Sequence, residues 1–115
     1  MSITSRIQGN TAQISISGRF DFELHREFRE AYTHLIRDQN VREICIELSH
    51  VDYLDSSALG MLMLLNERAS GSNKSVTLLS PSGVASHVLE VANFQHLLTI
   101  SHDRPGANAP VAASL

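Results

Sequence analysis

The 115-residue sequence is short of cysteine, of clustered charge and of long hydrophobic runs. Its single cysteine, Cys45, cannot form an internal disulfide, which fits a reducing cytoplasm. The nine basic residues form no run and the net charge is −3, so we expect neither nucleic acid nor a membrane as partner. The longest apolar run, 61–65, is too short to span a bilayer, and the first dozen residues lack an apolar signal core. These absences predict a cytoplasmic protein.

Patterns typical of catalysis and metal binding are also missing. A serine hydrolase has Gly-x-Ser-x-Gly after a strand, whereas here Asp55 precedes Ser56-Ser57 and Ala58 follows. No glycine-rich loop that could hold a phosphate is present. Cys45 lies in an apolar strand, which predicts an unreactive thiol. We therefore expect a protein that is not an enzyme and has no metal or cofactor. The six histidines show no pair at metal-binding spacing (His25, His34, His50, His87, His96, His102).

The composition is that of a globular domain, with 43% hydrophobic and 18% charged residues. At this length we expect one domain over residues 1–101. Residues 102–115 contain two prolines, a glycine and mostly small side chains, which predicts a disordered tail.

Hydrophobic periodicity predicts the element order β-β-α-β-α-β-α-β. Alternating strands and helices favour an α/β fold with a mixed, mostly parallel sheet covered by helices. In such folds, sites collect at the carboxyl ends of strands and at helix N-termini. The expected elements are a hairpin turning at Gly9-Asn10, a helix capped by Asp21, a strand over 41–48, a helix over about 56–69 and a strand over 75–80. A third helix should open at 81–82, and a last strand is expected over 97–100. The third helix has Val84, Val88 and Val91 on one face, Ala85 and Leu89 beside them, and Asn93 as left-handed cap.

The segment 53–62 joins a buried strand to an unusually apolar helix. Asp55, Ser56 and Ser57 stand at the junction, where helices prefer to begin. At about 100° per residue, one stripe of the helix faces the core. Its members are Ala58, Leu62, Leu65 and Ala69. The opposite side carries Ser56, Gly60, Met63, Leu64 and Glu67.

That opposite side is apolar where a covering helix should be polar. Met63 and Leu64 either form a partner-binding surface or touch a neighbouring helix of the same domain.

Two motifs in this chain resemble the STAS domain. The first, Leu54-Asp55-Ser56-Ser57-Ala58-Leu59-Gly60, follows a strand, and the second, Gly18-Arg19-Phe20-Asp21, precedes a helix. More narrowly, residues 3 to 100 resemble the bacterial anti-sigma factor antagonists. Those proteins usually have Asp-Ser-Ser-Gly-Leu-Gly and Gly-x-Leu-Asp at these sites, so Ala58 and Phe20 are departures. They generally end in a fourth helix, which the tail here does not predict.

The resemblance implies a phosphorylation switch at Ser56, with Ser57 as the alternative phosphosite. The unmodified protein would bind and sequester an anti-sigma factor that is itself a serine kinase. Phosphorylation by that kinase would release it, and a metal-dependent serine phosphatase would reset the switch. We expect a monomer when the protein is free. The expected partner-binding residues are Asp21, Asp55, Ser57, Gly60, Met63 and Leu64.

A phosphate at this position is also physically sensible. It adds about −1.5 to −2 charges, which the N–H groups of a helix N-terminus accommodate. A partner would meet a hydrated dianion beside apolar surface, which should weaken binding by roughly several kcal/mol.

Two other interpretations remain open. Asp55, Ser56 and Ser57 could serve only as a helix cap, an effect of about 1 kcal/mol. The chain could instead be an unswitched STAS module, such as a scaffold subunit or an accessory subunit of a lipid transporter's ATPase. Such a module would bind its partner equally well with Ser56→Ala and Ser56→Asp.

Overall fold

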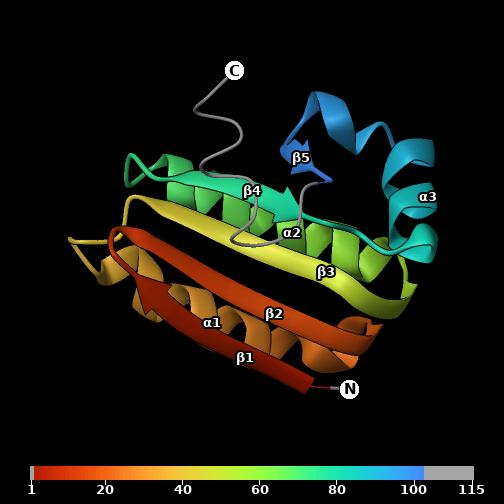
Figure 1. Ribbon diagram of the computed structural model, residues 1–115, viewed down its shortest axis with the longest axis horizontal. Coiled ribbons are helices and arrows are strands. Elements are labelled where there is room, and N and C mark those ends of the chain that lie inside the picture. Colours follow the sequence, from red (N-terminus) through yellow and green to blue (C-terminus); the bar gives the residue numbers. More distant parts are fainter. Residues whose placement is uncertain (1, 103–115) are drawn as a thin grey trace.

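Within residues 2–102, five strands form one sheet in the same order as they occur in the chain (Figure 1). The computed structural model describes residues 2–102, so the tail predicted from residue 102 lies, apart from His102, outside the described residues. The predicted order of elements and the α/β fold class are confirmed. The elements are β1 (Ser2–Gln8), β2 (Thr11–Phe20), the 3₁₀ turn η1 (Phe22–Leu24), α1 (His25–Arg37), β3 (Glu43–Leu54), α2 (Ser56–Ser70), β4 (Ser75–Leu79), α3 (Gly83–Val91), the 3₁₀ turn η2 (Phe94–His96) and β5 (Thr99–Ser101).

The sheet is mixed, because β1 and β2 pair antiparallel whereas the pairs that follow are parallel. Their hairpin turns at Gly9-Asn10, with Gln8 opposite Thr11, as predicted. Gly9 has a φ of +64°, a conformation that glycine adopts without steric cost. The pairs β2–β3, β3–β4 and β4–β5 are all parallel, so their carboxyl ends lie at one edge of the sheet.

Helices α1 and α2 lie on one face of the sheet, behind it in Figure 1, and α3 packs against β3 near the end of the sheet. The core lies between these helices and the strands. The predicted core stripe of α2 is confirmed, since Ala58, Leu62, Leu65 and Ala69 are all fully buried. Among residues 2–102, no helix is long and apolar enough to cross a membrane.

The strand predicted over 41–48 is wrong at its carboxyl end, because β3 continues to Leu54. The polar residues after Leu48 stay in the sheet by pairing with the end of β2, after shifts in register. Val51 pairs with Gly18 and Leu54 with Phe20, and both β3 side chains are buried. This extension brings the ends of β2 and β3 level with each other.

The predicted apolar residues of α3 are buried only in part. Ala85 and Leu89 are buried and Val88 packs against the core, whereas Val84 and Val91 are exposed. At about 100° per residue, Val91 lies nearly opposite Leu89, so a helix that packs on the sheet with one side cannot bury both.

The last strand is displaced as well. Its bounds are Thr99–Ser101 because η2 occupies the residues before it. Asn93 does adopt the predicted left-handed conformation, with a φ of +60°, and Phe94 after it is buried.

Candidate functional site

Two aspartates cap the segments that follow the neighbouring strands β2 and β3. Asp21 Oδ1 accepts a hydrogen bond of 3.0 Å from the backbone N–H of Glu23, at the start of η1. Asp55 Oδ1 accepts one of 3.2 Å from the N–H of Ala58, at the start of α2. Each aspartate directly follows its strand, and the two strands end level with each other, so the aspartates lie at the same edge of the sheet.

The second carboxylate oxygen of each aspartate contacts an Arg–Tyr pair. Arg19 Nε donates to Asp21 Oδ2 over 3.2 Å, and Tyr53 Oη donates to Asp55 Oδ2 over 3.5 Å. The Arg19 guanidinium lies 3.9 Å from the centroid of the Tyr53 ring, a cation–π contact. The hydrogen bond to Asp21 raises the pKa of Arg19, so the guanidinium stays charged. The pair therefore links the two caps across the strands.

Sequence reasoning missed this link, although a signal for it exists. Arg19 and Tyr53 each stand two residues before a capping aspartate and are paired in register between β2 and β3. Equal spacing from the ends of adjacent parallel strands places two side chains together.

The two serines after Asp55 differ in accessibility. Ser56, the first residue of α2, is exposed, and its hydroxyl makes no hydrogen bond to another residue within the described part of the chain. Ser57 is half-buried. A modifying enzyme can therefore reach Ser56 more easily than Ser57.

The outer side of α2 is apolar and exposed. Met63 is 49% exposed and Leu64 is 39% exposed, while Gly60 beside them presents only backbone. Leu64 lines a groove shared with α1 and remains accessible, so the partner-binding interpretation of this surface stays a prediction.

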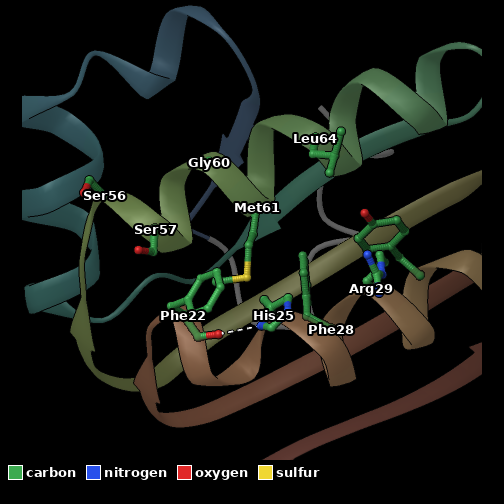
Figure 2. A pocket seen from close by; sticks show the side chains of 10 residues that line it. Phe22, His25, Phe28, Arg29, Ser56, Ser57, Gly60, Met61 and Leu64 are labelled. Atoms are coloured by element: carbon green, nitrogen blue, oxygen red, sulfur yellow. Dashed lines mark hydrogen bonds between the residues drawn. The ribbon is translucent and has the colours of Figure 1, made fainter.

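A groove of about 340 Å³ lies between α1 and α2 (Figure 2). Its walls include Phe22, His25 and Phe28 from the side of α1, and Ser57, Gly60 and Leu64 from α2. Figure 2 shows the side chain of Met61 extending from α2 toward Phe22 on the opposite wall. Ser56 also lines this groove, so the predicted phosphosite and part of the predicted partner surface meet here.

The wall from α1 was not predicted from the sequence. Phe22 is 63% exposed and stacks on the His25 ring, with centroids 4.3 Å apart and planes 12° apart. His25 Nδ1 contacts the Phe22 carbonyl oxygen at 2.8 Å, and because a carbonyl only accepts, Nδ1 must donate. The sequence signal for this wall is a large aromatic residue directly after a predicted capping aspartate, and it identifies the groove only together with the neighbouring helix.

Within residues 2–102, no three side chains of histidine, cysteine, aspartate or glutamate are grouped so that they could hold a metal ion. Cys45 is buried, and burial, together with the nearby Glu43 carboxylate, raises the pKa of its thiol to about 11. The thiol is therefore protonated at neutral pH and is a poor nucleophile.

The chain belongs to the STAS domain family, because a family model described as "Mlab, STAS domain" matches residues 3–99. A STAS-domain containing protein of Pseudomonas aeruginosa is 40% identical over 103 residues, which cover 88% of this chain and 100% of that protein. The anti-sigma-B factor antagonist of Staphylococcus aureus is 22% identical, over 88% of this chain and 93% of its own length. The resemblance found in the sequence is thus confirmed.

Solved structures show the same fold. The anti-sigma factor antagonist SpoIIAA in its unphosphorylated form superposes with a TM-score of 0.76 at 16% identity, over 99% of this chain and 100% of that one. The phosphorylated form of SpoIIAA, described as a Bacillus cell fate determinant, gives a TM-score of 0.70 at 17% identity, over 98% and 97% of the two chains. These relatives are named for a regulatory role rather than for an enzymatic activity, in agreement with the expectation that this chain is not an enzyme.

Proposed function

We propose that this protein is an anti-sigma factor antagonist switched by phosphorylation of Ser56. The observation that carries the proposal is the exposed Ser56 hydroxyl at the first residue of α2, directly after the capping Asp55 and beside exposed apolar surface. Relatives named as antagonists, one of them solved in unphosphorylated and phosphorylated forms, support the same role.

The fold can accept the phosphate without rearrangement. The first N–H groups of a helix have no partner within the helix, and the helix dipole favours negative charge at that end. Asp55 uses one oxygen to cap Ala58, so Ser56 is not needed as the cap. The phosphate therefore changes the surface rather than the core.

Phosphorylation should weaken partner binding more than it changes the stability of the fold. An anti-sigma factor that packs on Met63 and Leu64 must bury the neighbouring phosphate as well. Desolvating a dianion without a matched cation weakens binding by roughly several kcal/mol. In this scheme the anti-sigma factor is also the kinase, and a metal-dependent serine phosphatase in the same cytoplasm restores the binding form.

A titration of the isolated anti-sigma factor tests the proposal. Ser56→Ala should bind with unchanged affinity and become insensitive to ATP, whereas Ser56→Asp should bind weakly. Ser57→Ala is the matched control and should still respond to ATP. Equal affinities for Ser56→Ala and Ser56→Asp would reject the switch. Mass spectrometry of protein isolated from its own cells should find the phosphoryl group on Ser56 in a fraction that varies with growth condition.

An unswitched STAS module, a scaffold or an accessory subunit of a transporter's ATPase, is the second candidate. It is favoured by Ala58, which is fully buried where the antagonists usually have glycine. Absence of phosphate on Ser56 under all growth conditions would support this candidate and leave Asp55 as a simple cap.

A further inference from the structure

We propose that the groove between α1 and α2 receives an acidic, amphipathic segment of the protein partner. One large apolar side chain of this segment enters beside Gly60, and a neighbouring carboxylate pairs with Arg29. The inference rests on the proposed function, since the groove opens beside Ser56 and its occupant belongs to the partner that phosphorylation releases.

The apolar part of the groove has the features of a protein-binding surface. Its lip includes Phe22, which is 63% exposed, and its base is the fully buried Phe28. The ring of Phe22 is held by the stacked His25, whose Nδ1 binds the Phe22 carbonyl. An aromatic side chain that is both exposed and held in place loses little conformational entropy on binding, as interface anchors do.

Gly60 indicates where the partner's side chain enters. This glycine lies inside α2, where glycine weakens the helix relative to alanine. Neither backbone nor packing requires it, because its φ is not positive and a Cβ built there meets no atom within 4 Å. The absence of a side chain instead keeps the wall of the groove low between Ser57 and Leu64.

The charge of the groove predicts that the partner segment carries a carboxylate next to its apolar side chain. Arg29 lines the groove, is exposed, and makes no ion pair with any residue of the described chain. No acidic side chain lines the groove, and α2 carries no charged residue before Glu67. A guanidinium matches a carboxylate with two parallel hydrogen bonds, so an acidic residue of the partner fits here and a basic one does not.

Phosphorylation would also act on this partner through charge. Ser56 and Arg29 line the same groove, and Figure 2 shows them at opposite ends of it. A phosphate on Ser56 adds about −1.5 to −2 charges at the end away from Arg29, which disfavours an acidic ligand by like-charge repulsion.

A display library of random peptides of about 12 residues, selected on the immobilised full chain, supplies the probe. We expect enriched peptides to place an aspartate or glutamate within about one helical turn of a Phe, Trp or Leu. Fluorescence anisotropy of one labelled peptide should show about tenfold weaker binding to Arg29→Glu. Arg26→Glu is the matched control, the same charge change on the same helix but outside the groove, and should bind as the wild type does.

Three outcomes would overturn the inference: no enrichment, enriched peptides without an acidic residue, or equal binding to Arg29→Glu and wild type. The result is independent of the switch. If Ser56→Ala and Ser56→Asp bind the anti-sigma factor equally while Arg29→Glu loses the peptide, the switch fails and the groove stands. If those two Ser56 variants differ while Arg29→Glu keeps the peptide, the groove fails and the switch stands.

Discussion

Replacing Gly60 by alanine should stabilise this protein, although glycine at this place belongs to the motif that identifies the family. The residue is exposed inside α2, its φ is not positive, and the new Cβ meets no atom within 4 Å. The change therefore costs no strain and gains helix propensity, about 1 kcal/mol. For a domain of this length that gain corresponds to a melting temperature higher by roughly 4–5 °C.

Thermal unfolding followed by circular dichroism measures the shift, and urea unfolding measures the free energy. Gly9→Ala is the matched control with the opposite sign. Gly9 has a φ of +64°, so alanine there should cost about 1 kcal/mol or more. A Gly60→Ala protein that melts at or below the wild-type temperature would refute the reasoning, because it would mean that the native backbone or packing requires glycine. Peptide binding in the groove should fall even as stability rises.

Three further changes test other parts of the structure. Asp55→Ala should lower the free energy of unfolding by about 1 kcal/mol in urea, because the N–H of Ala58 loses its cap, while Asp55→Asn should retain most of it; equal losses would contradict the capping role. At about pH 8, iodoacetamide should modify Cys45 about 100-fold more slowly in the folded than in the urea-unfolded protein, because the thiol pKa rises from 9.0 to about 11. The raised pKa means that this thiol's contribution to stability is complete below about pH 8.5 and is lost as pH rises toward 11; a rate profile centred near pH 9 in the folded protein would contradict this. Leu64→Glu should change stability by less than about 0.5 kcal/mol, because the side chain is half-exposed, yet abolish binding of the anti-sigma factor; a collapsed fold would instead make Leu64 part of the core.

Local signals in the sequence predicted the elements that depend on local interactions. Gly9-Asn10 between two alternating runs was sufficient for the hairpin, because the turn sets its register. The four apolar residues of the α2 stripe were sufficient for its core face, since a long helix repeats its pattern over several turns. Asp21 and Asp55 were identifiable as caps because capping is a contact between near neighbours.

Features that depend on distant segments could not be predicted in the same way. The polar residues of β3 after Leu48 remain in the sheet only because β2 extends beside them. The groove needs two helices from different parts of the chain, so neither Phe22 nor Arg29 reveals it alone. The equal spacing of Arg19 and Tyr53 from the capping aspartates indicates their contact only once β2 and β3 are known to be neighbours that end level with each other.

The strands lie in space in the same order as in the chain, and this has a consequence for folding (Figure 1). Each strand pairs with the one synthesised just before it, so no strand must wait for a later segment to be inserted beside it. Pairings between consecutive strands keep contact order low for a parallel sheet, which favours faster folding. The sheet can therefore grow from β1 toward β5 as the ribosome releases the chain. In that order of folding, α2 with Ser56 at its start forms before the ribosome has released the edge strand β5.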